Sequence, residues 1–172
     1  MVPPSSVRRL APEDTEAFRA LRLEGLAESP AAFGSSPDVA SEHDLDLIRS
    51  RLTPDRDDAA FGAFTGGKLV GVLGLHRPTH PKGRHRGQVW GMYVDPAHRR
   101  KGHGRTLVTA LVDYARGLDG LAWLDLGVGV ENAAARTLYA SFGFTEWGIE
   151  RDALRVDGAR VDEAHMSLEL QP

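Results

Sequence analysis

Apolar residues recur along the chain at two different spacings, and the spacing separates predicted helices from predicted strands. Between Glu13 and Ala27 they follow the helical period behind a proline and two acidic residues, which predicts a first helix. The same period over 107–118 predicts a central helix that begins just after Gly102-His103-Gly104. Shorter helices are predicted over 44–52 and from Asn132, as the N-cap, to Ser141.

Runs rich in branched and aromatic residues fill the intervals between these helices and predict strands. Gly66-Gly67 divides the run over 59–75 into two strands, because a tight hairpin turn needs positive φ angles. Asp157-Gly158 likewise separates predicted strands over 144–156 and 161–170. Further strands are predicted over 7–10, 88–94 and 121–130, and loops over 29–40 and 77–86. The predicted element order is β-α-α-β-β-β-α-β-α-β-β.

The composition is typical of a globular protein and excludes several classes. The chain has 172 residues, 41% hydrophobic and 26% charged, and no apolar run approaches the ~18 residues that span a bilayer, so we expect no membrane partner. No repeat or linker divides it, which predicts one domain over 1–172. The first ten residues lack the pattern of a secretory signal, so a cytoplasmic location is expected. Without cysteine, the chain has no disulfide, thiolate metal site or cysteine nucleophile.

The charges are distributed unevenly along the chain. The net charge is −3, yet the segment 76–105 holds eight Lys and Arg residues against Asp95 alone. A basic island on an acidic body argues against a nucleic-acid partner, which needs a broad positive surface. It suits a compact anion such as a phosphorylated cofactor. A solvated charged loop is the alternative.

The segment from Val94 to Arg105 carries the clearest chemical pattern, a strand followed by a glycine-bearing loop and a helix start. This geometry directs unpaired backbone N–H groups and the positive end of the helix dipole at one point, where a phosphate can bind. Gly102 and Gly104 leave the anion free to approach the backbone. The spacing lacks the Gly-Lys-Ser/Thr ending of a Walker loop and the third glycine of a dinucleotide fingerprint. A purely structural loop remains the alternative.

Two motifs resemble the GNAT acetyltransferase superfamily. Arg99-x-x-Gly102-x-Gly104 is similar to its Gln/Arg-x-x-Gly-x-Gly/Ala signature between the fourth strand and the third helix. The segment from Asn132 through Tyr139 to Phe144 is similar to its Asn-x-x-Ala-x-x-Leu-Tyr-x-x-x-Gly-Phe segment. The resemblance covers roughly 59–148. It implies an α/β fold with a central mixed, mostly antiparallel sheet flanked by helices, and acetyl-CoA bound where the fourth and fifth strands splay apart.

The resemblance also implies which residues contact acetyl-CoA. Backbone amides from Arg100 to Thr106 would bind the pyrophosphate, with side-chain charge from Arg99 or Arg105; the residues are Arg100, Lys101, Gly102, His103, Gly104, Arg105 and Thr106. The strand end Met92, Tyr93 and Val94 would pair through its backbone with the pantetheine arm, and the Met92 N–H would polarise the thioester carbonyl. Asn132 matches a residue that contacts pantetheine, and it equally fits a helix N-cap.

Tyr139 lies where the superfamily often places a phenol near the sulfur of CoA. A phenol can protonate the departing thiolate, so Tyr139 is the predicted general acid; a core aromatic is the alternative. The general base is open, because Gln88 stands where histone-type relatives carry a glutamate. An ordered water, Glu150, Asp125 or His85 could take that role. Trp90, Trp123 and Trp147 are expected to fill the sheet faces, with Trp90 or Tyr93 as alternatives for the acceptor cleft.

These observations predict an N-acetyltransferase that moves an acetyl group from acetyl-CoA to a primary amine by direct attack in a ternary complex. Alternatives are a different acyl donor, an alcohol acceptor, or a CoA-binding module that senses without catalysis. The acceptor is a small molecule or a peptide, with residues 29–52, including Phe33 and Glu42, and the Asp157-Gly158 turn beside it. No metal is expected, since His76, His80 and His85 lack ligand spacing. This interpretation leaves a homodimer open.

Overall fold

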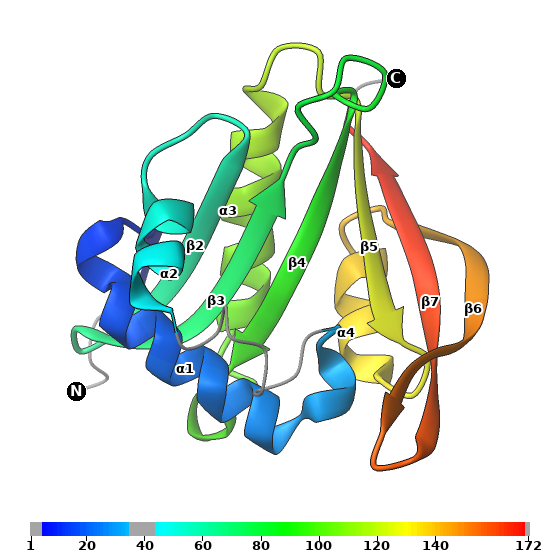
Figure 1. Ribbon diagram of the computed structural model, residues 1–172, viewed down its shortest axis with the longest axis horizontal. Coiled ribbons are helices and arrows are strands. Elements are labelled where there is room, and N and C mark those ends of the chain that lie inside the picture. Colours follow the sequence, from blue (N-terminus) through cyan, green and yellow to red (C-terminus); the bar gives the residue numbers. More distant parts are fainter. Residues whose placement is uncertain (1–4, 35–43, 171–172) are drawn as a thin grey trace.

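The computed structural model describes residues 5–34 and 44–170, and the predicted order of helices and strands is confirmed (Figure 1). Short 3₁₀ turns precede α1, follow it and precede α3. The strands are β1 (Ser5–Arg9), β2 (Asp58–Thr65), β3 (Lys68–His76), β4 (Arg86–Val94), β5 (Trp123–Gly129), β6 (Thr145–Val156) and β7 (Ala159–Glu169). The helices are α1 (Thr15–Glu28), α2 (Leu45–Leu52), α3 (His103–Arg116) and α4 (Ala133–Ala140), and the 3₁₀ turns are η1 (Pro12–Asp14), η2 (Pro30–Ala32) and η4 (Pro96–His98).

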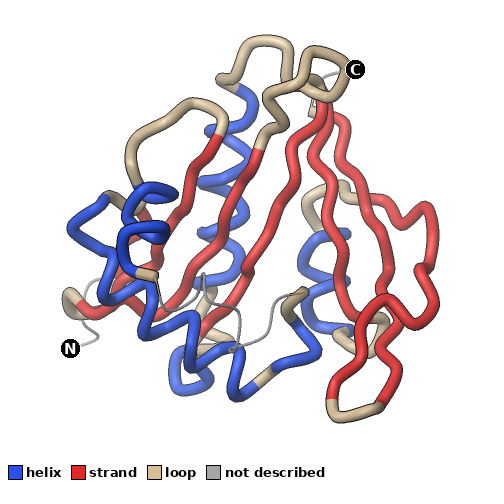
Figure 2. The backbone as a smooth tube through the Cα atoms, in the orientation of Figure 1, coloured by secondary structure: helices blue, strands red, loops and turns tan. Residues whose placement is uncertain are grey.

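The strands form one mixed sheet with the order β1-β2-β3-β4-β5-β7-β6. Every neighbouring pair is antiparallel except β4 and β5, which run parallel. These two strands pair only where Arg86, Gly87 and Gln88 face Trp123, Leu124 and Asp125. Beyond this point they diverge, as Figure 1 and Figure 2 show. The mixed, mostly antiparallel sheet with separated fourth and fifth strands is therefore confirmed.

Helices cover the two faces of the sheet unequally. In Figure 1, α3 and α4 lie behind the sheet, and α1 and α2 lie in front of its β2–β4 half. The rear core includes Leu107 and Leu111 of α3 packed with Leu124 and Leu126 of β5. Since side chains alternate along a strand, Asp125 and Gly127 of β5 face the front. The front of β5 and β7 thus has polar positions that neither α1 nor α2 packs against.

The β2–β3 and β6–β7 hairpins form at the glycine-bearing turns that the sequence predicts. Gly66 and Gly67 have φ angles of 57° and 82°, and Asp157 and Gly158 have 49° and 81°. The strand limits differ by one or two residues from the prediction. For example, β4 begins at Arg86 rather than 88, because the Arg86 and Gly87 backbone pairs with Trp123 and Leu124. Strand pairing rather than local composition sets such limits.

The prediction that Trp147 fills a face of the sheet is wrong. Trp147 of β6 is 66% exposed and does not fill a sheet face. It lies near the sheet edge, where its indole N–H donates to Ser167 Oγ at 2.9 Å and its ring lies 5.3 Å from that of His165. Trp90 and Trp123 are half-buried. None of the helices in the described parts of the chain is long and apolar enough to cross a bilayer.

Candidate active site

The loop between β4 and α3 presents a row of free backbone donors. Gly102 is the N-cap of α3 with φ 87°, and Arg100 also has a positive φ of 60°. Among the described residues, none accepts a hydrogen bond from the backbone N–H groups of 100–105; the first helical bond of α3 runs from the Thr106 N–H to the Gly102 carbonyl. Free N–H groups at the positive end of a helix bind anions. The loop can therefore hold a phosphate, as its glycine spacing predicts.

The basic side chains of this loop mostly have protein partners. Arg99 donates from Nε to the Val94 carbonyl at 2.9 Å and forms an ion pair with Glu28 at 2.8 Å, which links the loop to the end of α1. This pairing holds the pKa of the Glu28 carboxyl below its ordinary value. Arg105 donates to Ser141 Oγ at 3.2 Å, and Lys101 donates to the Ala97 carbonyl at 2.9 Å. Arg99 thus positions the loop, and the backbone supplies the anion donors.

His103 and Thr106 lie at the start of α3, the first buried and the second exposed. His103 is buried, and burial, followed by the neighbouring charges of His98 and Lys101, lowers the pKa of its imidazole. The ring therefore favours its neutral form near pH 7. Thr106 Oγ1 donates to the Gly102 and His103 carbonyls at 3.2 and 3.0 Å. The Thr106 bonds thus hold the carbonyls of the first two residues at the start of α3.

The end of β4 has a free backbone edge toward β5. Its ladder with β5 stops at Gln88, so the β5-facing edge near Met92 has no strand partner among the described residues. A positive φ of 69° at Gly91 accompanies an irregular register with β3. Tyr93 turns its ring into the front core, 6.0 Å from that of Phe33. Only the backbone of Tyr93 can therefore contribute to the open edge.

The two residues singled out near α4 have clear structural positions. Asn132 Oδ1 accepts from the Ala135 N–H at 3.1 Å, so its N-cap role is confirmed. Tyr139 is 5% exposed and packs edge-on against Phe144, 5.6 Å away. Burial raises the pKa of the Tyr139 phenol well above its ordinary value of 10.0. The side chain is thus a core residue whose hydroxyl stays protonated, and its role as a proton donor stays a prediction.

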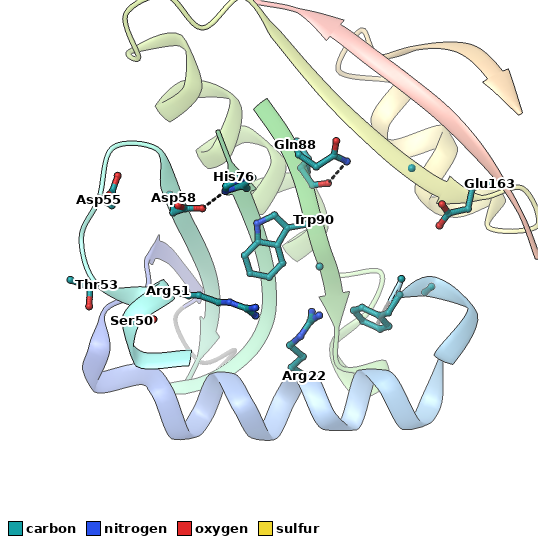
Figure 3. Close-up of a pocket in the computed structure, with 17 residues that line it drawn as sticks. Arg22, Ser50, Arg51, Thr53, Asp55, Asp58, His76, Gln88, Trp90 and Glu163 are labelled. Atoms are coloured by element: carbon teal, nitrogen blue, oxygen red, sulfur yellow. Dashed lines mark hydrogen bonds and ion pairs between the residues drawn. The ribbon is translucent and has the colours of Figure 1, made fainter. Parts of the chain in front are cut away.

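A pocket of about 770 Å³ opens on the front of the sheet beside the diverging strands (Figure 3). Gln88, Trp90 and Gly91 of β4 form its floor, with Gly127 of β5 and Glu163 of β7 on the far side. The helix side contributes Arg22, Phe33 and Arg51, and the β2–β3 side contributes Asp55, Asp58 and His76. His76 Nδ1 lies 2.7 Å from Asp58 Oδ1. The pocket combines an aromatic surface with both signs of charge.

A second cavity of about 730 Å³ lies between η2, the end of β5 and the β6–β7 hairpin. Residues 29–34 and the strands of that hairpin line the two cavities, whereas the Asp157-Gly158 turn lines neither, and the acceptor-side assignment stays a prediction. Phe33 lines the first pocket. Glu42 lies outside the described residues.

Comparisons with known proteins agree with this geometry. The model of the acetyltransferase (GNAT) family matches residues 23–144, well over half of the chain. The chain belongs to the GNAT acetyltransferase family. Its diverging β4 and β5 and the glycine loop before α3 are thus the family's features on this sequence, and the resemblance seen in the two motifs is confirmed.

Individual relatives place this GNAT chain among acetyltransferases. It is 42% identical over 100 residues to the N-alpha-acetyltransferase RimI of Mycobacterium tuberculosis, covering 57% of this chain and 59% of that protein. It is 32% identical over 146 residues to the mycothiol acetyltransferase of Renibacterium salmoninarum, covering 83% of this chain and 41% of that protein. The chain thus spans about half the length of the curated relatives it matches.

Solved structures share the GNAT fold over nearly the whole chain. A GNAT acetyltransferase from Streptococcus pneumoniae superposes with a TM-score of 0.85 at 20% identity, covering 96% of this chain and 99% of that one. A Salmonella typhimurium protein solved with its cofactor acetyl-CoA has a TM-score of 0.84 at 24% identity, covering 97% and 94% of the two chains. These similarities establish the fold.

The candidates for the general base in this GNAT chain differ in their surroundings. Asp125 is bound by Arg86 at 2.5 Å and also accepts from Ser167 Oγ, so its oxygens are occupied. His85 is exposed in the loop before β4. Glu150 Oε2 accepts a hydrogen bond from His165 Nε2 at 2.8 Å. Asp125 pairs with the pocket residue Gln88 through its strand, and Glu150 neighbours the pocket residue Glu163 in a cluster with His165.

The interpretation of 76–105 as one basic island is wrong. Arg77 and Arg84 pair with Asp57, and Arg86 pairs with Asp125, all at or before the start of β4. Lys82 also precedes β4, whereas Arg99, Arg100, Lys101 and Arg105 follow its end. Nine residues of extended strand, roughly 25–30 Å, separate the two groups. Only the second group lies near the anion-binding loop of the GNAT fold.

Sequence reasoning missed Glu163, which lines the pocket from β7. Ala164 and Met166 of the same strand are buried in the rear core, and side chains alternate along a strand, so Glu163 faces the front. This alternation was the signal available in the sequence. Of all described residues, one group of side chains has the composition and proximity to ligate a metal, namely Glu150, Glu163 and His165. It includes none of the loop histidines that the sequence singles out.

Proposed function

We propose that this chain transfers an acetyl group from acetyl-CoA to a primary amine by direct attack in a ternary complex. The observation that carries the proposal is the row of unbonded N–H groups at 100–105, located beside the free edge of β4. The loop would bind the pyrophosphate and the β4 edge would pair with the pantetheine arm. The pocket on the front of the sheet would then receive the amine next to Gly91.

The chain's own groups would perform the chemical steps. The Met92 N–H would polarise the thioester carbonyl, and Tyr139 would protonate the departing thiolate. A covalent enzyme intermediate is not part of the proposal, because the chain has no cysteine. The acceptor is a cationic amine on a small molecule or a peptide. Three acidic residues of the pocket lining, Asp55, Asp58 and Glu163, outnumber Arg22 and Arg51 and favour an ammonium group.

The test measures thiol release from acetyl-CoA in the presence of spermidine, kanamycin or a short peptide with a free N-terminal alanine. Mass spectrometry checks that the amine gains one acetyl group. Acetyl-CoA affinity is measured separately by calorimetry. Affinity with acetylation of an amine supports the proposal, whereas absence of acetyl-CoA binding overturns it.

A second candidate is a module that binds acetyl-CoA without catalysis. The observation that favours it is Gln88, whose amide cannot take a proton at the position where histone-type relatives carry a glutamate. This candidate predicts tight acetyl-CoA binding and no acetylation of any amine. A different acyl-CoA donor or an alcohol acceptor would appear in the same assay as preferential release from another thioester or as an acetyl ester.

A further inference from the structure

Glu163 extends toward the pocket across a glycine. The residue lies on β7, and Figure 3 shows it on the β5–β7 side of the pocket, across from Trp90. A Cβ added to Gly127 of β5 would lie 3.1 Å from Glu163 Oε2. A side chain at position 127 would therefore compete with the carboxylate for space. The glycine lets Glu163 lie over β5, facing the region where β4 and β5 diverge.

Glu163 supplies a proton acceptor on the side of the pocket where the other lining residue of β5 and β7 is Gly127. Gln88 is an amide, and Asp125 is occupied by Arg86 and Ser167. Asp58 also lines the pocket, but it bonds His76 on the opposite, β2–β3 side. Glu163 is the lining carboxylate that comes from β7, next to the diverging strands.

The neighbours of Glu163 connect it to solvent. Glu150 Oε2 and His165 Nε2 lie 2.8 Å apart, and one ligand atom each of Glu150, Glu163 and His165 lies within 4.8 Å of the others. Histidine can accept a proton at one nitrogen and release one to a bonded carboxylate. The Glu150 side chain is 57% exposed. A proton on Glu163 therefore has a short route through His165 and Glu150 to water.

We propose that Glu163 is the general base of the reaction and that His165 and Glu150 carry its proton to solvent; this inference rests on the proposed acetyltransferase function. Glu163 removes one proton from the acceptor ammonium, and the freed lone pair forms the C–N bond as the C–S bond breaks. The second proton lost by nitrogen replaces the one that Tyr139 donates to the thiolate. One proton in total leaves through His165.

The pH dependence should identify the base. Activity of the wild type should fall at acid pH, because protonated Glu163 cannot accept a proton. The other titratable or charged groups that face this site are Arg22 of α1, Arg51 of α2, Asp55 before β2, Asp58 of β2, His76 of β3, Glu150 of β6 and His165 of β7. Of these, the His76–Asp58 pair is the competing source of an acid limb, so a His76→Gln variant must be measured beside Glu163→Gln.

The experiment measures kcat/KM against pH with spermidine, kanamycin and the alanine peptide as acceptors. Glu163→Gln should lower kcat/KM by about 10²-fold or more and remove the acid limb, while acetyl-CoA affinity by calorimetry stays within about twofold. His76→Gln should keep the limb. Glu169→Gln, the same substitution on β7 away from the pocket, is the matched control and should behave as the wild type.

The other outcomes of this experiment overturn the proposal, and they distinguish a wrong base from a wrong function. Full activity of Glu163→Gln, or loss of the limb only in His76→Gln, overturns the assignment of the base and leaves the acetyltransferase function intact. Loss of wild-type activity on treatment with EDTA, restored by Zn²⁺, overturns it in favour of a metal on the same three residues. No acetylation of any amine by the wild type overturns both the function and this inference.

Discussion

Gly102→Ala tests most directly whether the loop after β4 binds acetyl-CoA. Gly102 has φ 87°, and an added Cβ would meet no atom within 4 Å. The methyl group therefore causes no clash. Its effect is confined to the strain of an L residue in the left-handed region, about 1–2 kcal/mol.

This strain should change the free energy of unfolding, the Kd for acetyl-CoA, or both. If the free loop keeps its conformation, the free energy of unfolding falls by the same amount. If the free loop relaxes, the strain is imposed only when acetyl-CoA binds, and Kd rises about 5- to 30-fold. We expect the strain to divide between the two quantities, because bonds from Arg99, Lys101 and Thr106 hold the free loop while the N–H groups of 100–105 have no acceptor among the described residues.

Calorimetric titration with acetyl-CoA and urea unfolding measure the two quantities on the same preparation. Gly158→Ala is the matched control. Gly158 lies in the β6–β7 turn with φ 81°, and an added Cβ would meet no atom within 4 Å, so the substitution imposes the same kind of strain away from the loop. The control should bind acetyl-CoA with unchanged affinity. If Gly102→Ala changes neither affinity nor unfolding, the loop does not need its left-handed conformation and the reasoning fails.

Tyr139→Phe should lower turnover roughly 10²-fold and leave acetyl-CoA affinity unchanged in calorimetry, since it removes the proposed proton donor and keeps the packed ring; unchanged turnover would make Tyr139 a core residue only. Phe33→Ala should raise KM for the amine but not for acetyl-CoA, because Phe33 lines the pocket; equal changes would contradict this. Arg99 lowers the pKa of Glu28 below 4.5, so the pair stabilises the fold above that pH and is lost as the pH falls through the folded value. Urea unfolding of wild type and Glu28→Gln should therefore differ at pH 7 and converge in acid.

The order of elements could be predicted because each depends on residues close in sequence. An apolar stripe such as 107–118 can bury one face only as a helix, and Gly66-Gly67 adopts the positive φ angles that end a strand in a hairpin. The glycine loop before α3 is local in the same sense. Gly102 has the left-handed conformation there, and the Asn132 cap bonds a residue three positions away.

Features that depend on strand pairing were not predictable in this way. The basic residues of 76–105 are close in sequence, yet β4 separates those before it from those after it. Asp57 and Asp125 pair with arginines of the group at or before the start of β4. Trp147 looks like a core residue by composition. Its strand β6 lies at the sheet edge, beyond β7, where α1 and α2 do not reach.

The position of Glu163 shows why the base was the hardest part of the site to infer. Comparison with histone-type relatives looks for the catalytic carboxylate at one position of the fourth strand, and this chain has Gln88 there. The chain instead places a glycine at 127 of β5, and a carboxylate from β7 occupies the space above it. Glycine and glutamate are 36 residues apart in sequence, and only the pairing of β5 with β7, which sets Gly127 opposite His165 and Gly129 opposite Glu163, brings them together. A missing catalytic side chain on one strand is therefore weak evidence against catalysis, because a neighbouring strand can supply the group across a glycine.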